Sequence, residues 1–132
     1  MDDHCYWIGF DRVRGIGSVR TSQLLAHFGD LKTAWFADPA EIRKAGLPNK
    51  VVAEFYRLRN EIDLEGELDK IHALNISVVT INDDTYPQLL KSIPNYPPVL
   101  YTKGKILDQD RFAIAVVGTR RKTSYGKQVT RE

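Results

Sequence analysis

The sequence has almost no cysteine and no long apolar run. Cys5 is the only cysteine among 132 residues, so an internal disulfide framework and a cysteine-built metal site are both excluded. Its place in a helical pattern beside Trp7 and Ile8 favours a small buried side chain over a nucleophile. The longest strongly apolar stretch, residues 113–117, is far too short to cross a bilayer, and no signal-peptide pattern opens the chain. These absences predict a soluble, cytoplasmic protein with no membrane partner.

Metal-ligand spacing is also missing. His4, His27 and His72 are dispersed along the chain and show no ligand spacing with one another. The adjacent carboxylates Asp83 and Asp84 precede a Thr-Tyr-Pro turn, where solvated loop residues are a commoner outcome than a cation site. We therefore expect no bound metal.

Net positive charge is absent from the first three quarters of the chain and gathers at its end. From Lys103 onward there are eight basic and three acidic residues, a net charge of +5, whereas the preceding residues carry −3. A concentrated field of one sign attracts polyanions such as nucleic acid at moderate salt. A solvated basic tail is the alternative interpretation, and the surrounding motifs have to decide between the two.

The first part of the chain, residues 1–74, shows helical spacing and no alternating strand pattern. Three aspartates that can cap a helix precede apolar helical patterns: Asp30, Asp38 and Asp63. A helix between Gly17 and Gly29 is predicted to carry four apolar side chains on one face: Val19, Leu24, Leu25 and Phe28. Short connections between such helices predict a compact all-α domain.

A glycine turn leads into that helix. Gly15, Ile16 and Gly17 resemble the turn of a helix-hairpin-helix motif, in which unpaired amides at the following helix N-terminus face a phosphate oxygen. Such a contact binds DNA without reading its sequence. The same hairpin also serves as a purely structural corner, so Gly15 and Gly17 are accessory candidates for DNA binding.

The periodicity changes after this helical domain. Residues 76–81 and 99–103 are predicted strands, and residues 87–93 can form one or two helical turns between them. Residues 112–117 are apolar throughout, as expected for a strand buried on both faces of a parallel sheet. The content is therefore α+β, with a second, α/β domain beginning at residue 75.

Glycine and basic residues follow the third predicted strand. Only Gly118 and Gly126 are present there, so the dinucleotide fingerprint is missing and no nicotinamide or other cofactor is expected. Arg120 stands in its place, with Arg121 and Lys122 beside it, and a guanidinium fork at a strand end suits a phosphodiester. Pairing of Arg120 with a carboxylate from a neighbouring element outside these residues is the alternative.

Several motifs of the chain occur in an order that resembles the DprA/Smf family of DNA-processing proteins. They are residues 86–90, residues 97–101 with Lys103 and Gly104, residues 115–120 and residues 124–126. Residues 15–17 with Leu24, Leu25, Phe28 and Gly29 resemble the N-terminal helical, SAM-like domain of that family, although Thr21 replaces a common alanine. The resemblance implies a SAM-like domain over residues 1–74 and the start of a Rossmann-like DNA-binding domain over residues 75–132.

The resemblance also implies a function. Family members bind single-stranded DNA on a basic face, form homodimers and load the strand onto RecA during natural transformation, with no established catalytic reaction. The family's phosphate-binding motif falls on Gly118, Thr119 and Arg120, and its continuation falls on Ser124, Tyr125 and Gly126. Arg121, Lys122 and Lys127 are accessory candidates.

Two other functions were weighed against DNA binding. A Rossmann-like enzyme acting on a nucleotide phosphate needs catalytic carboxylates near its phosphate loop, and the sequence offers no persuasive pair there. A helical adaptor that binds protein is the third possibility. Because the chain stops where the first helix of a Rossmann domain begins, we expect it to be the front part of a longer family member. RecA binding and dimerisation are then expected of the longer protein rather than of these residues.

Overall fold

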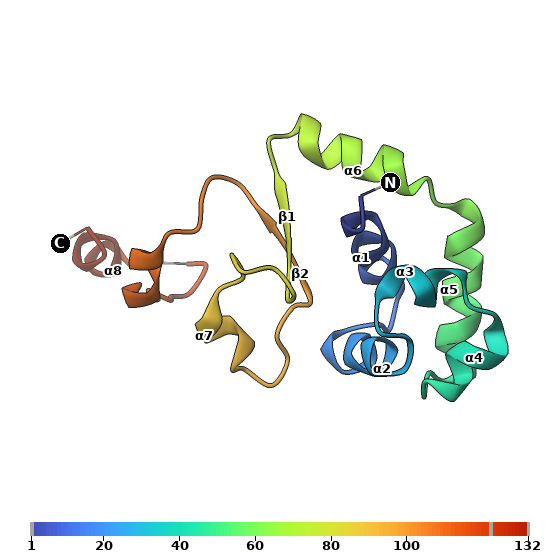
Figure 1. Ribbon diagram of the computed structural model, residues 1–132. Helices are drawn as coiled ribbons and strands as arrows, with labels where there is room; N and C mark the ends of the chain where they lie inside the picture. The colour runs from blue at the N-terminus through green and yellow to red at the C-terminus, as the bar shows by residue number, and fades with distance from the viewer. Residues whose placement is uncertain (1, 122, 132) are drawn as a thin grey trace.

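The computed structural model describes residues 2–121 and 123–131, and it is mixed α and β with far more helix than strand. Helices come first: α1 (His4–Asp11), α2 (Ser18–Phe28), α3 (Leu31–Phe36), α4 (Pro39–Lys44), α5 (Asn49–Glu61) and α6 (Leu64–Ala73). The strands β1 (Ser77–Thr80) and β2 (Val99–Thr102) follow, with α7 (Gln88–Lys91) between them. A 3-10 turn, η1 (Asp108–Phe112), and α8 (Ser124–Val129) come last (Figure 1). Within the described residues, no helix has the length and apolarity to cross a membrane.

Local signals set most of the helix ends. The side chains of Asp30, Asp38 and Asp63 each accept a hydrogen bond from a backbone N–H in the first turn of α3, α4 and α6, so the three predicted caps are confirmed. Gly29 and Gly46 follow α2 and α4 with φ angles of +83° and +98°. Glycine has no Cβ to oppose that left-handed backbone, which explains why the helices end there.

The hydrophobic core forms around α1, whose residues Cys5 to Phe10 are all buried. The ring of Phe10 stacks on that of Phe55 with centroids 4.9 Å apart, and the indole of Trp35 meets both rings edge-on at 5.3 and 5.2 Å. Edge-to-face and offset pairs of this kind are favourable beyond the area that they bury. The thiol of Cys5 is 1% exposed, as expected for a small buried side chain.

The prediction that four apolar side chains share one face of α2 is wrong in part. Leu24 is fully buried, but Val19 is 62% exposed. Five residues at 100° each place these two side chains about 140° apart around the helix, so they point in different directions. Thr21, one turn before Leu24, takes the buried position instead.

The strands β1 and β2 form a two-stranded antiparallel sheet in which Ser77 pairs with Thr102 and Thr80 with Val99. These two strands and α7 confirm the predictions for residues 76–81, 99–103 and 87–93 to within two residues at each end. The sheet packs on α1, which therefore lies between the sheet and α3 (Figure 1). Val99 is 5% exposed and belongs to the same core as the helices.

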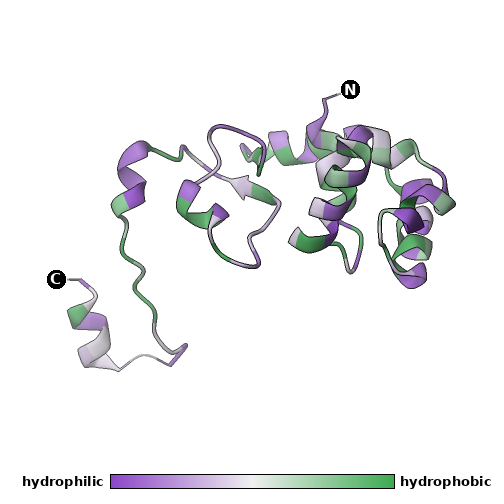
Figure 2. Ribbon diagram, turned by 60° about the horizontal axis from the view of Figure 1, so that its bottom comes forward, coloured by the Kyte–Doolittle hydropathy of each residue, from purple (hydrophilic) through white to green (hydrophobic). Residues whose placement is uncertain are grey.

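The third predicted strand is wrong. Phe112 ends η1, and residues 113–117 form an irregular segment, with Ile114 88% and Val117 90% exposed. Figure 2 shows it as a largely hydrophobic stretch of coil between η1 and α8. A strand needs the backbone of a neighbour to receive its hydrogen bonds, and within the described residues the sheet contains only β1 and β2. The described residues therefore do not form the parallel sheet expected around this segment.

The chain after β2 contributes little to the packed part of the molecule. Every described residue from Lys103 to Arg131 is exposed except Gly126, which is half-buried, and the core contains no residue beyond Val99 among those described. Ending the chain after Gly104 should therefore leave the midpoint of thermal unfolding unchanged within about 2 °C, as measured by circular dichroism. A large drop in that midpoint would show that the removed residues pack on the core.

Candidate nucleic-acid interface

The predicted phosphate-binding residues lie on the exposed loop between η1 and α8. Gly118, Thr119 and Arg120 follow each other on this loop, and all three are exposed. The hydroxyl of Thr119 donates a hydrogen bond to the carbonyl oxygen of Arg121 over 2.9 Å. This local bond tightens the turn that presents the guanidinium of Arg120 to solvent.

The helix expected near Ser124 is present as α8. Thr123 precedes it with extended backbone, and its hydroxyl oxygen accepts a hydrogen bond from the N–H of Gly126 over 3.1 Å. This cap was not predicted, although a threonine directly before a helical segment is a usual N-cap signal. The N–H of Gly126 is therefore satisfied by Thr123 and is not left for a ligand.

Loop and helix enclose an open hollow of about 710 Å³. Five of the predicted residues line it: Gly118, Thr119, Tyr125, Gly126 and Lys127. Its remaining wall consists of Val116, Val117, Thr123, Val129, Thr130 and Arg131. The hollow combines apolar side chains, hydroxyls and two cationic groups, a combination that suits a phosphate joined to a less polar sugar or base.

Other predicted residues lie beside the hollow rather than in it. Arg120, Arg121 and Ser124 are exposed but are not among the residues that line the cavity. Lys122 lies outside the described residues. Gly15 and Gly17 precede α2, in a different part of the molecule from α8 (Figure 1). The structure thus brings the two main motifs together and leaves the helix-hairpin-helix turn apart from them.

Basic side chains form ion pairs on the helices but not in the last part of the chain that the structure describes. On the helices, several cations are paired with carboxylates: Arg12 with Glu67, Lys44 with Glu41, Arg57 with Glu54 and Glu61, and Lys70 with Glu67. In the part of the chain that the structure describes, no basic side chain from Lys103 onward has such a partner. The positive charge near the hollow remains available to an anion.

The glycine turn before α2 has a clear structural role. Gly15 has a φ of +98°, and a Cβ at this position would lie 3.2 Å from a methyl group of Val51. The guanidinium of Arg20 donates a hydrogen bond to the carbonyl oxygen of Gly15. Gly17, by contrast, has open space where a Cβ would stand. The backbone therefore requires glycine at position 15, whereas packing does not require it at position 17.

Across residues 2–121 and 123–131, no three histidine, cysteine or acidic side chains gather as a metal site needs.

Comparison with known proteins places these features in a class. Residues 77–132 match the family model described as DNA recombination-mediator protein A. This match covers β1, β2, the loop and α8, and so includes the whole of the hollow. The chain therefore carries a segment typical of DNA-processing proteins.

Two curated relatives extend that result to the helices. The chain is 31% identical to Protein Smf of Synechocystis over 98% of its own length, and 36% identical to the DNA processing protein DprA of Bacillus subtilis over 83%. The chain belongs to the DprA/Smf family. It spans 34% and 40% of the length of these two relatives. No solved structure matches it significantly.

Proposed function

We propose that this chain contributes a single-stranded DNA-binding surface to a recombination mediator, and that the surface lies on residues 103–131. The single observation that carries the proposal is the exposed positive charge around the hollow between the loop and α8, which has no carboxylate partner among the described residues. The membership of the chain in the DprA/Smf family also supports DNA binding, because the matched family model describes a recombination mediator. The proposed role is binding rather than catalysis.

In this proposal, the surface binds the DNA backbone. The guanidinium of Arg120 donates two parallel hydrogen bonds to a phosphate group. Lys127, on α8, and Arg131, just after it, add positive charge. The hydroxyl of Ser124 is a further donor, and Tyr125, 77% exposed, supplies an apolar wall to the hollow. Contacts of this kind are independent of base sequence, which suits a protein that handles any strand.

The domain architecture, the partners and the cellular location are proposed for the whole protein. We propose that the helices up to residue 74 form a SAM-like domain and that residues 75–132 open a Rossmann-like domain. Transfer of the strand to RecA, homodimerisation, natural transformation as the setting and the cytoplasm as the location are proposed on the same basis. They rest on the family alone.

Replacing Arg120 with alanine in the whole protein should weaken binding of an oligonucleotide of single-stranded DNA about tenfold, because one charge-assisted contact is lost. The slope of log affinity against log salt concentration should become shallower by about 0.7, the value for one phosphate of a single strand. Fluorescence anisotropy across a salt series measures both quantities.

The matched control is Arg111→Ala, which removes the same charge from η1, where neither this residue nor its neighbours in sequence line the hollow, whereas Arg120 directly follows Thr119 of its lining. It should change affinity much less than Arg120→Ala. Equal losses from the two variants would mean that the segment acts as a diffuse basic tail, and unchanged binding in Arg120→Ala would remove this residue from the site.

The 132-residue chain alone is expected to bind DNA weakly or undetectably. Tight and saturable binding by this chain that survives Arg120→Ala but is lost on changing Gly17 would move the site to the helix-hairpin-helix turn.

A further inference from the structure

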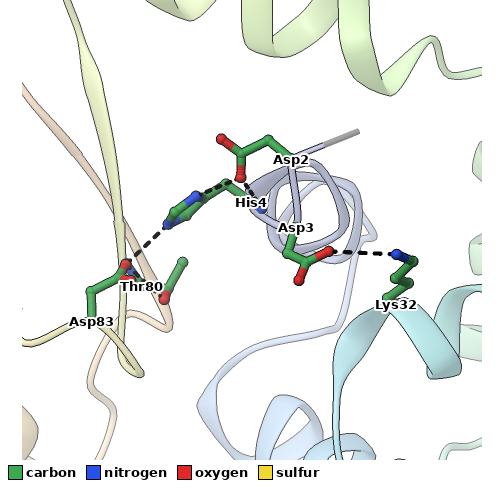
Figure 3. A network of polar contacts seen from close by, with 6 residues as sticks. All are labelled: Asp2, Asp3, His4, Lys32, Thr80 and Asp83. Carbon is green, nitrogen blue, oxygen red and sulfur yellow. Dashed lines mark hydrogen bonds and ion pairs between the residues drawn. The ribbon is translucent and has the colours of Figure 1, made fainter.

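His4 lies between two carboxylates that come from different parts of the fold. At the start of α1, its Nδ1 is 2.8 Å from Oδ1 of Asp2, and its Nε2 is 3.1 Å from Oδ2 of Asp83 (Figure 3). Asp83 belongs to the turn after β1, 79 residues away from His4 along the chain. The imidazole therefore joins the N-terminus of α1 to the sheet.

The geometry of this bridge specifies a protonation state. A neutral imidazole carries one N–H, and its other nitrogen offers only a lone pair. Each ring nitrogen of His4 faces an oxygen of a carboxylate, which accepts a hydrogen bond but, when ionised, cannot donate one. Both contacts can be hydrogen bonds at the same time only when the ring is a doubly protonated imidazolium.

Asp83 also makes contacts with the end of β1. Its Oδ2 accepts hydrogen bonds from the N–H of Thr80 over 2.6 Å and from the hydroxyl of Thr80 over 2.9 Å. Thr80 itself is 2% exposed. The expectation that Asp83 is simply a solvated loop residue is therefore wrong, because the end of β1 fixes its carboxylate and directs it toward α1.

We propose that His4 is a proton-operated clasp that fastens the turn after β1 to the N-terminus of α1 when it is protonated and loosens that attachment when it is neutral. Among the described residues, the clasp is one of three side-chain hydrogen-bond links between the helices and the later chain. The others join Tyr101 to Asp11 over 3.0 Å and Tyr96 to Ser22 over 2.9 Å. Those two links do not involve histidine and persist across the neutral range, so loosening is local to the turn.

The surrounding charges favour the fastened state. Partial burial of His4 opposes its protonation, but the hydrogen bonds with Asp83 and Asp2 outweigh this effect and raise the pKa of His4 above its usual 6.5. The backbone N–H of His4 holds the pKa of Asp2 below its ordinary value. The other charged groups that face this cluster are His72 of α6, which acts on Asp2, and Lys32 of α3, which lies 3.9 Å from Asp3 (Figure 3).

The sign of the pH effect follows from the raised pKa. A group that binds its proton more tightly in the folded state stabilises that state fully below its unfolded pKa of about 6.5, and this contribution is lost as the pH rises through the folded value. Attachment of the turn should thus weaken on passing from mildly acidic to mildly alkaline solution, within the range of about pH 5 to 8 in which histidine operates.

The test uses the intact chain, nuclear magnetic resonance and two pairs of variants. The His4 ring should titrate with a pKa above 6.5 in the native chain, and this pKa should fall toward 6.5 in Asp83→Asn but stay unchanged in Asp84→Asn, whose carboxylate is exposed and has no contact with the ring among the described residues. A native His4 pKa at or below 6.5 would overturn the proposal.

Amide hydrogen exchange gives the second measurement. After correction for intrinsic exchange, protection of the amide of Thr80 should fall several-fold as the pH rises through the pKa of His4. His4→Gln should abolish that dependence, whereas His72→Gln should retain it. The same fall in His4→Gln would assign the effect to another group and reject the clasp. His4 and Asp83 are not part of the apolar core, so His4→Gln and Asp83→Asn are both expected to fold.

Discussion

Replacing Phe55 with alanine is expected to lower the free energy of unfolding by about 3–5 kcal/mol, the largest single effect that we anticipate. The side chain of Phe55 is fully buried, stacks on Phe10 and receives the edge of Trp35. Alanine removes the aromatic contacts and leaves a cavity in the part of the core where α1, α3 and α5 meet. Urea unfolding followed by tryptophan fluorescence measures the loss, because Trp35 reports directly on this cluster.

Phe36→Ala provides the control for that experiment. Phe36 is 68% exposed, and its ring has one aromatic neighbour, Tyr6, at 5.8 Å. Its loss should cost about 1 kcal/mol or less, the value of a single aromatic pair. If Phe55→Ala were as mild as Phe36→Ala, the three-ring cluster would not be the centre of the core.

Gly9→Ala should destabilise the protein for the opposite reason, because it adds an atom where there is no room. A Cβ on Gly9 would lie 2.5 and 2.7 Å from two ring carbons of Trp35 and 2.9 Å from a methyl group of Leu64. Real Cβ atoms almost never approach other atoms so closely, and both neighbours are themselves buried. Overpacking of this kind costs about 1–3 kcal/mol.

Alanine also has a higher helix propensity than glycine, by about 1 kcal/mol. The two effects therefore oppose each other, and the buried position decides in favour of the clash. Gly118→Ala is the control, because a Cβ there meets nothing within 4 Å. It should leave the unfolding free energy unchanged, and a stabilising Gly9→Ala would mean that α1 and α3 can separate freely.

Sequence reasoning succeeded where the determining interactions are local. The caps at Asp30, Asp38 and Asp63 act within one turn, and so do the glycines that end helices, which is why the helical half was predictable. The strands β1 and β2 were identified from their β-branched residues. Their antiparallel register, however, depends on how far residues 81–98 fold back, and no local pattern encodes that return.

Long-range effects explain the errors. Residues 112–117 have the composition of a buried strand, but composition cannot supply the neighbouring backbone that a strand requires. The contact of His4 with Asp83 was not predicted, because the two residues are 79 positions apart in the sequence. Val19 is different, since simple helical geometry already separates it from Leu24, and the assignment of a shared face overlooked that angle.

The candidate site was predictable in outline. The motifs containing Gly118 and Tyr125 were recognised, and both line the hollow. Thr123 was missed although its capping role is a local one. The position of Arg120 beside the hollow, rather than in its wall, depends on the path of an exposed loop and could not be obtained from spacing alone.

The spatial separation of the packed core from the cationic segment has an evolutionary consequence. Most substitutions are harmful because they destabilise the fold, and a protein survives only while it remains above a threshold of stability. None of the described residues from Lys103 onward belongs to the core cluster. Mutations there can alter ligand preference without consuming the protein's reserve of folding energy, so this segment can diverge faster than the helices that carry it.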